Sequence, residues 1–358
     1  MNIEIKKAGP SQKKSIPADV SKIGFGRAFS DHMFLMEYAP DQGWHHQRIE
    51  PYHALTLDPA AIVLHYSQEV FEGLKAYRGN DDGIYLFRHK DNFKRMNRSC
   101  VRMVMPEIDI DFVSKALKQL VLLERDWIPK SPGCSLYIRP TMIGIDPVLG
   151  VRPSEKYLFY IIVGPAGAYY PEGFNPVSIY VSDEYVRAAR GGVGEAKTGG
   201  NYAAQLLGQV EAQKKGFTQV LWLDAVERRY VEEVGTMNIF FKFGDEVVTS
   251  PLDGSVLHGL TRDSIIHILN HWGMKVSERR FTIDEVIEAQ KSGALREVFG
   301  SGTAAIISPV KCIHYRGVDY QVADGAIGPL AQKLYDFILA LQYGYEPDPF
   351  GWVERIDQ

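Results

Sequence analysis

The chain has 358 residues, a length that favours two domains. Apolar residues make up 45% and charged residues 23%, so the composition is that of a globular protein and excludes a disordered or fibrous one. The formal net charge is -4, which gives no reason to expect a nucleic acid or an anionic membrane as partner.

Cysteine usage and the first residues bear on the compartment. The chain contains three cysteines, Cys100, Cys134 and Cys312, with no zinc-ligand spacing between them, which favours a reducing compartment and no metal. Residues 1–15 are polar and contain no apolar run of the kind found in signal peptides. No apolar stretch reaches membrane-spanning length. We therefore expect a cytoplasmic protein.

The first half of the chain predicts two helices and a strand. Apolar residues recur at helical spacing from Phe93 to Val104 after the start signal Asp91-Asn92, and a second helix is predicted over residues 112–127. Residues 157–163 form a short apolar run before Gly164-Pro165, which is typical of a buried strand. The segment 164–173 is rich in Gly and Pro and carries no periodicity, so it predicts a linker between domains.

The second half mixes short strands with helices. Strands are predicted over residues 177–181, 218–223, 230–234, 237–243, 246–249 and 296–307, the last interrupted by Gly300-Ser-Gly302. Helices are predicted over residues 203–215, 261–272, 283–290 and 328–341. The third helix follows a capping box, Thr282-x-x-Glu285. Because strands and helices do not alternate strictly, we expect an α+β fold.

The segment 187–202 has five glycines around one lysine, Lys197, just before a predicted helix. A flexible surface loop is the simplest interpretation. A nucleotide-binding P-loop is a second, because Gly191 and Ala196-Lys197-Thr198 match G-x-x-x-x-G-K-[ST] except at Ala196. Residues 184–190 separate the preceding strand from the glycines, however, and Gly199-Gly200 would break a helix at the lysine, which disfavours the P-loop.

A Schiff-base lysine is the third interpretation of Lys197. A partly desolvated lysine is a nucleophile toward aldehydes, and such chemistry uses an organic cofactor, most often pyridoxal phosphate. That cofactor needs an acid for its pyridine nitrogen, a partner for its ring hydroxyl and an anion site for its phosphate. The sequence offers Glu233, Tyr202 and the glycine turn 257–261 at a helix start for these three tasks.

Five motifs then resemble the signatures of branched-chain amino-acid aminotransferases, which are fold-type IV pyridoxal-phosphate enzymes. In chain order they are Phe71-Glu-Gly-Leu-Lys-Ala-Tyr-Arg-Gly79, Leu136-Tyr-Ile-Arg-Pro140, Lys197-Thr-Gly-Gly-Asn-Tyr202, Glu233-Val-Gly-Thr-Met-Asn238 and Gly300-Ser-Gly-Thr-Ala304. The resemblance runs from about Gly24 to Val310. It implies a smaller N-terminal α/β domain (residues 1–165), an interdomain loop (166–176) and a larger, barrel-like C-terminal domain (177–358) with the lysine and the cofactor site.

The resemblance also implies roles in cofactor binding. Lys197 would form the Schiff base with pyridoxal 5'-phosphate and act as the general acid and base. Glu233 would keep the pyridine nitrogen protonated, and Tyr202 would hydrogen-bond the ring hydroxyl. The remaining cofactor-binding positions, most of them for the phosphate, would be Arg95, Val234, Gly235, Thr236, Leu260, Thr261 and Thr303.

The substrate site follows from the same resemblance. The backbone of Gly302, Thr303 and Ala304, with the Tyr66 hydroxyl, would receive the substrate α-carboxylate. The side-chain pocket would be formed by Phe29, Phe71, Tyr137, Val151, Tyr169, Thr236 and Met237, some of them from a second subunit. Arg139 would pair with the side-chain carboxylate of glutamate while the aromatic walls accept branched chains.

The expected function is reversible transfer of the amino group of L-leucine, L-isoleucine or L-valine to 2-oxoglutarate by a homodimer. A D-amino-acid aminotransferase or an aminodeoxychorismate lyase is an alternative in the same fold, and a nucleotide-binding ATPase or a catalytically silent assembly protein lies outside it. The animal enzymes carry a C-x-x-C redox switch where this chain has Ala305 and Ser308, so no thiol control is expected. For Lys75 an ion pair away from the substrate is the preferred interpretation.

Overall fold

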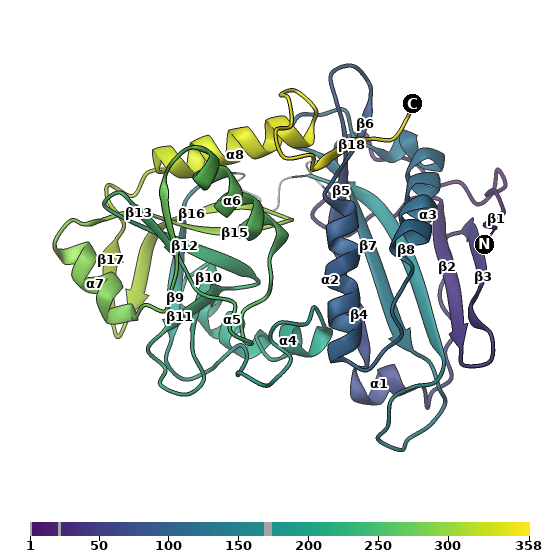
Figure 1. The fold of residues 1–358 in the computed structure, drawn as a ribbon, viewed down its shortest axis with the longest axis horizontal. Coiled ribbons are helices and arrows are strands. Elements are labelled where there is room, and N and C mark those ends of the chain that lie inside the picture. Colours follow the sequence, from purple (N-terminus) through teal and green to yellow (C-terminus); the bar gives the residue numbers. More distant parts are fainter. Residues whose placement is uncertain (1, 21–22, 168–173) are drawn as a thin grey trace. The chain divides into compact units, whose positions relative to one another are not determined.

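The structure, a computed structural model, describes residues 2–20, 23–167 and 174–358 (Figure 1). The chain divides into two compact units. The first unit contains Met1–Pro171, Ala196–Gly199 and Leu339–Gln358, and the second contains Glu172–Glu195 and Gly200–Ile338. Lys197 therefore belongs to the first unit, although most of the glycine-rich segment belongs to the second.

The first unit is built on one mixed sheet with the strand order β1-β3-β2-β8-β7-β5-β6-β18, and β4 pairs with β7. Its strands are β1 (Glu4–Ile5), β2 (His32–Ala39), β3 (Gly43–Pro51), β4 (Glu69–Phe71), β5 (Leu74–Arg78), β6 (Ile84–Phe87), β7 (Ser135–Gly144), β8 (Tyr157–Ala166) and β18 (Val353–Arg355). Its helices are α1 (Ile62–Tyr66), α2 (His89–Arg102) and α3 (Ile110–Leu123). Neighbouring strands run antiparallel, except that β1 and β3 are parallel.

Helices α2 and α3 form the main core with this sheet. Phe93, Met96 and Cys100 recur on one face of α2 and pack with Leu117 and Leu120 of α3 in a single buried cluster. The Asp109 carboxylate caps α3 by accepting from the Phe112 N–H. Both predicted helices are confirmed, but both end earlier than expected. α2 ends at Arg102, because the next residues turn and Val104 adopts a positive φ. α3 ends at Leu123 and is followed by a short 3-10 helix, Arg125–Trp127.

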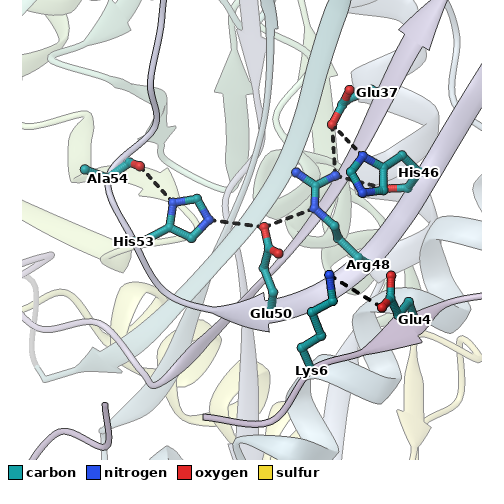
Figure 2. Close-up of polar contacts among 8 residues, drawn as sticks. All are labelled: Glu4, Lys6, Glu37, His46, Arg48, Glu50, His53 and Ala54. Atoms are coloured by element: carbon teal, nitrogen blue, oxygen red, sulfur yellow. Dashed lines mark hydrogen bonds and ion pairs between the residues drawn. The ribbon is translucent and has the colours of Figure 1, made fainter. Parts of the chain in front are cut away.

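A row of charged side chains links β2, β3 and the loop after β3 (Figure 2). Arg48 lies between two carboxylates and donates to Glu37 and Glu50, each at 3.0 Å. His53 continues the row, with its Nε2 3.1 Å from Glu50. A hydrogen bond to the Ala54 carbonyl and the Glu50 carboxylate raise the pKa of His53. This row ties the loop that follows β3 to the sheet.

The second unit contains a closed barrel. Its strands are β9 (Val177–Ser182), β10 (Gln219–Leu223), β11 (Val231–Val234), β12 (Met237–Phe243), β13 (Glu246–Thr249), β14 (Lys275–Glu278), β15 (Leu295–Gly302), β16 (Ile306–Tyr315) and β17 (Val318–Gln321). The strand order is β11-β10-β9-β16-β15-β12-β13-β14, and the extra pairing of β11 with β12 closes β9, β10, β11, β12, β15 and β16 into a ring. The expected α+β fold with a barrel-like domain is confirmed.

The helices of this half are α4 (Gly199–Ala203), α5 (Leu206–Lys214), α6 (Leu260–His271), α7 (Ile283–Lys291) and α8 (Pro329–Gln342). The predicted capping box is confirmed, because Thr282 Oγ1 accepts from the Glu285 N–H at the start of α7. The helix expected over 203–215 is confirmed as α5, although it begins later, at Leu206. The interrupted strand expected over 296–307 is wrong, because this segment is a hairpin of β15 and β16 in which Gly302 pairs with Ile306.

The C-terminal segment departs from the predicted division of the chain. Leu339–Gln358 packs in the first unit, because β18 pairs with β6, whereas the sequence places it in a domain spanning 177–358. Of the predicted interdomain loop, Ala166 ends β8 and residues 168–173 lie outside the described residues. Within the described ranges no helix is both long and apolar enough to span a membrane, and no cluster of three or more His, Cys, Asp and Glu side chains is suited to bind a metal.

A buried histidine joins the two core helices of the first unit. His89 begins α2, and its Nε2 lies 2.7 Å from the Ser114 hydroxyl of α3. Burial lowers the pKa of His89 to about 4 from 6.5. Between these values the unfolded chain binds a proton that the folded chain does not, so stability falls as pH is lowered through this window.

We expect this linkage to reach about 3 kcal/mol at the acidic end. The measurement is the urea dependence of unfolding above and within that pH window. Replacing His89 with Gln should flatten the pH dependence, while replacing the exposed His271 should leave it unaltered. An H89Q variant as acid-sensitive as the parent would contradict this assignment.

Candidate active site

The Lys197 segment is held against β4 and α2 of the first unit. The Lys197 N–H donates to Ser99 Oγ at 2.9 Å, and the Lys197 carbonyl accepts from the Phe71 N–H at 3.0 Å. The Gly199 N–H donates to Glu69 Oε1 at 2.6 Å. Lys197 Nζ lies 4.8 Å from the centre of the Phe71 ring. Two hydrogen bonds thus fix the backbone of Lys197 itself, a third fixes that of Gly199, and an aromatic ring lies against the lysine amine.

Arg139 contacts the same aromatic ring. Its guanidinium carbon lies 4.7 Å from the centre of the Phe71 ring, and its Nη2 donates to the Tyr137 hydroxyl at 2.9 Å. Tyr137 takes this position because Gly73 lacks a side chain: a Cβ there would lie 2.3 Å from the Tyr137 hydroxyl oxygen. Arg139 Nε is buried without a hydrogen-bond partner in the described part of the chain. Arg139 is thus a cation with hydrogen-bonding capacity among aromatic rings.

A cavity of about 160 Å³ opens beside Arg139 within the first unit. Phe29 lines this cavity because residues 28–30 pack against β8. The Ser30 N–H donates to the Val163 carbonyl at 2.8 Å. Gly164 allows the close approach, since a Cβ there would lie 2.0 Å from the Ala28 oxygen. The cavity is lined by Phe25, Gly26, Ala28, Phe29, Tyr137, Arg139, Ile162, Val163, Gly164 and Pro165. Three residues that the sequence selects for the substrate pocket, Phe29, Tyr137 and Arg139, therefore share one mostly apolar cavity.

Arg95 lies on α2 in a buried ion pair with Glu72. Arg95 Nε and Nη2 donate to the two carboxylate oxygens at 2.7 and 2.8 Å, and Asn92 donates to the same carboxylate at 2.9 Å. Arg95 is 4% exposed and Glu72 0%. Burial acts to raise the pKa of Glu72, but Arg95 and Lys197 together hold it below its ordinary value. The guanidinium is therefore fixed in orientation by a carboxylate.

Glu233 lies at the end of β11 in the second unit, and its charge is also compensated. Arg187 Nη1 lies 2.7 Å from Glu233 Oε2, and Asn238 donates to Oε1 at 2.9 Å. Arg187 is buried and also donates to the Ser255 carbonyl at 2.9 Å. The adjacent Glu232 accepts instead from the Ser255 hydroxyl at 2.5 Å. Glu233 is thus a buried carboxylate held between a cation and an amide.

Glycines shape the backbone around the predicted phosphate site. Gly235 turns the chain between β11 and β12 with a φ of +53°, and a Cβ there would lie 2.0 Å from Gln219 Oε1. Gly259 precedes Leu260 at the start of α6 and offers no side chain to cap the helix. A Cβ on Gly259 would lie 1.9 Å from Asn238 Oδ1. The close approach to Asn238 connects the start of α6 with the Glu233 carboxylate.

The β15–β16 hairpin lies beside β12. Ser301 pairs with Asn238 across the strands, and a Cβ on Gly302 would lie 3.1 Å from Met237. Thr303 and Ala304 form the turn that follows Gly302, and Thr236 ends the turn before Met237. The structure therefore gathers the Glu233 motif and the Gly300 motif, with Val234, Gly235, Thr236, Met237, Gly302, Thr303 and Ala304, at neighbouring strand ends.

Other predicted site residues lie elsewhere. Tyr66 ends α1, is 41% exposed and donates to the Leu149 carbonyl. Val151 is 84% exposed. Tyr202 is half-buried on α4. Thr261 lies in the first turn of α6. Tyr169 lies outside the described residues. The substrate roles of Tyr66, Val151 and Tyr169 stay predictions.

Four residues that hold the candidate site residues in place were not predicted from the sequence. They are Glu69, Glu72, Ser99 and Arg187. Glu72 and Arg187 stand inside segments that the sequence singles out, the Phe71 motif and the glycine-rich run, so a signal was present. Their partners are Arg95 and Glu233, which are distant in sequence. Without the fold, neither pairing could be assigned.

Comparisons with known proteins agree with the resemblance found in the sequence motifs. The family model for "Amino-transferase class IV" matches residues 69–313. A curated relative from Bacillus subtilis (strain 168), branched-chain-amino-acid aminotransferase 2, is 52% identical over 346 residues, which cover 97% of this chain and 95% of the relative.

Solved structures show the same similarity at lower identity. The branched-chain amino acid aminotransferase from Escherichia coli matches with a TM-score of 0.76 and 27% identity, covering 91% of this chain and 99% of the other. The branched-chain aminotransferase from the thermophilic archaeon Thermoproteus uzoniensis, solved with norvaline, matches with a TM-score of 0.74 and 25% identity, covering 91% and 99%. A further solved branched-chain amino acid aminotransferase, with pyridoxamine 5'-phosphate, matches with a TM-score of 0.75 and 27% identity, covering 92% and 100%.

These similarities extend over nearly the whole chain. The family match at residues 69–313 includes all five motifs, from the Phe71 motif to the Gly300 motif. About half of the residues are shared with a curated relative of similar length. The chain therefore belongs to the class IV aminotransferase family, among the branched-chain aminotransferases.

Proposed function

We propose that the chain is a branched-chain-amino-acid transaminase that uses pyridoxal 5'-phosphate. It transfers the amino group of L-leucine, L-isoleucine or L-valine to 2-oxoglutarate in a reversible ping-pong reaction, which gives the branched-chain 2-oxo acid and L-glutamate. The observation that carries the proposal, beside family membership, is the cavity in which aromatic and aliphatic walls surround one arginine, Arg139. Such a cavity suits both an apolar branched chain and a side chain that ends in a carboxylate.

The residues present fit the cofactor. Pyridoxal phosphate, when bound, supplies an aldehyde and a ring that accepts electrons from the substrate α-carbon. Its groups call for a lysine, a buried carboxylate and a phosphate site, and the chain has Lys197, the compensated Glu233 and the buried Arg95. The helix start at Leu260 and Thr261, which follows Gly259, adds backbone N–H groups of the kind that bind phosphate. Tyr202 and Thr303 complete the proposed cofactor-binding set.

The chain's own residues have distinct tasks in this reaction. The Lys197 amine moves the proton that leaves the substrate α-carbon, and its fixed backbone limits the positions that Nζ can reach. Glu233, whose carboxylate Arg187 and Asn238 hold in place, would keep the pyridine nitrogen of the bound cofactor protonated. Arg95, oriented by Glu72, neutralises phosphate charge. The backbone of Gly302, Thr303 and Ala304 receives the substrate α-carboxylate.

We further propose that the enzyme is a cytoplasmic homodimer. The support is a set of exposed apolar side chains on the first unit, which are Leu64, Tyr66, Val101, Val104, Leu149 and Val151. The Tyr66 hydroxyl donates to the Leu149 carbonyl and Gln68 donates to the Val104 carbonyl, so the segment 66–68 brings Leu149 and Val104 close to Tyr66. A second copy of the chain would cover this surface, and Val151 would then lie at the substrate pocket of the other copy. We also propose that the main border between the two domains lies in the loop 166–176, between the first and second compact units.

The two half-reactions test the function. We expect the pyridoxal form to react with L-leucine and with L-glutamate but not with D-alanine, measured as the loss of cofactor absorbance in single turnovers. Replacing Arg139 with Ala should lower kcat/KM for L-glutamate at least about tenfold more than for L-leucine, because only glutamate loses a charged hydrogen-bond partner.

The control is Arg296→Ala, which removes an exposed arginine from β15. It should leave the ratio of the two half-reactions unchanged. Equal losses with both substrates in the R139A variant would refute the role of Arg139, and turnover of D-alanine in place of L-leucine would favour the D-amino-acid alternative.

A further inference from the structure

Glu69 is the charged side chain among the three groups described above that hold the Lys197 segment. Ser99 contributes a neutral hydroxyl and Phe71 a backbone N–H, whereas Glu69 contributes a carboxylate that accepts from the Gly199 N–H at 2.6 Å. Hydrogen bonds to ionised acceptors are stronger than those between neutral groups. Glu69 is therefore placed to contribute most to the position of this segment.

The contact with Gly199 leaves no room for a side chain. A Cβ on Gly199 would lie 2.2 Å from Glu69 Oε1, well inside contact distance. The first glycine after Lys197-Thr198 thus lets the backbone approach the carboxylate. This explains a glycine in the lysine motif by a partner that lies 130 positions away in the sequence.

The same carboxylate lies near the cation of the substrate cavity. Glu69 and Phe71 point to one face of β4, since they are two residues apart on a strand. The Phe71 ring on that face lies 4.8 Å from Lys197 Nζ and 4.7 Å from the Arg139 guanidinium. Burial raises the pKa of Glu69, and the Arg139 charge acts in the opposite direction. Arg139 itself donates to the Tyr137 hydroxyl.

We propose that Glu69 is a positioning and specificity-determining residue of the aminotransferase. Through Gly199 it fixes the backbone of Lys197, and through its negative charge it weakens the binding of a second carboxylate at Arg139. The enzyme thereby keeps 2-oxoglutarate and glutamate from outcompeting branched-chain substrates, which carry no such carboxylate. The specificity half of this inference rests on the function proposed above, whereas the positioning half does not.

Two substitutions separate these roles. Glu69→Gln keeps an oxygen that accepts from Gly199 but removes the charge, and Glu69→Ala removes both. The matched control is Glu288→Gln, which removes one negative charge from an exposed position on α7.

The positioning role is measured on the apoprotein by amide hydrogen exchange. E69A should speed exchange at Gly199 by about tenfold or more, because a hydrogen bond to a charged acceptor is lost. E69Q should restore slow exchange, and E288Q should match the parent. Unchanged exchange at Gly199 in E69A would overturn the positioning role, whatever the enzyme's substrates are.

The specificity role is measured on the holoenzyme in the two half-reactions. E69Q should lower the KM for L-glutamate relative to the KM for L-leucine by about tenfold, since the negative charge that opposes a second carboxylate at Arg139 is removed from a partly buried site, where charges interact strongly. E288Q should not alter this ratio. An unchanged ratio in E69Q overturns the specificity role. A parent enzyme that does not transaminate L-leucine defeats the proposed function and this role together, while the exchange experiment still decides the positioning role.

Discussion

Replacing Lys197 with Ala is expected to lower kcat for transamination of L-leucine by at least about 10⁴-fold, because both the amine that binds the cofactor aldehyde and the proton-transfer group are lost. Lys197→Arg should be equally inactive. It keeps a cation against the Phe71 ring and near Glu72, but a guanidinium does not lose its proton and cannot replace the amine. The pair of variants thus separates the chemistry of the amine from its charge.

A covalent readout accompanies the kinetics. Borohydride reduction of the holoenzyme should add the mass of the cofactor to the peptide that contains Lys197, and this mass should be missing in K197A and K197R. Lys156→Ala, at an exposed position before β8, serves as the control and should behave as the parent. Addition of the cofactor mass to another lysine, with activity retained in K197A, would exclude Lys197 as the catalytic residue.

The helices were easier to predict than the sheets because their signals are local. The capping box of Thr282 and Glu285 lies within one turn, and α7 begins where it predicts. The strands β2, β3 and β7 were not predicted. β7 contains Pro140 in its middle and takes its partners from β8 and from the distant β4 and β5, so its stability depends on pairings that no short window contains.

The hairpin of β15 and β16 illustrates the same limit. The sequence predicts that Gly300 and Gly302 interrupt a single strand. Both glycines instead lie within β15, and their lack of a side chain leaves room for the Met237 side chain of β12. The turn lies after them, at residues 303–305. Packing against a neighbouring strand, and not a break in the chain, is the physical reason for glycine at these positions.

The candidate site was predictable to the extent that motifs mark it. Lys197, Glu233 and Arg139 each stand in a motif whose composition suggests its chemistry. The groups that orient them do not follow from the motifs: Ser99 and Glu69 hold the Lys197 segment from two different elements, α2 and β4. Such partners are brought together by the tertiary fold, and the spacing of residues in the sequence does not reveal them.

The buried pair of Arg95 and Glu72 leads to the second large effect. Glu72→Ala should lower the free energy of unfolding of the first unit by about 3–5 kcal/mol, because removing one partner leaves a buried charge without compensation. Arg95→Ala should cost a similar amount for the same reason. The contribution of Glu72 is present above the pKa of an unfolded glutamate and is lost as pH falls through its lowered value in the folded chain. Denaturant unfolding of the apoprotein measures both costs.

A double substitution separates the structural from the functional part of this pair. Replacing both residues with apolar side chains of similar volume, Glu72→Leu with Arg95→Met, should restore much of the stability that either single variant loses, because no charge is left buried. It should not restore the affinity for pyridoxal phosphate, since the cation proposed to bind the phosphate is absent. The exposed pair Lys90 and Asp111, separated by 2.8 Å, is the control, because its removal should change stability by less than about 1 kcal/mol. If the double variant bound the cofactor as tightly as the parent, Arg95 would be a structural residue, and the phosphate site would have to rest on the backbone around Gly235 and Leu260.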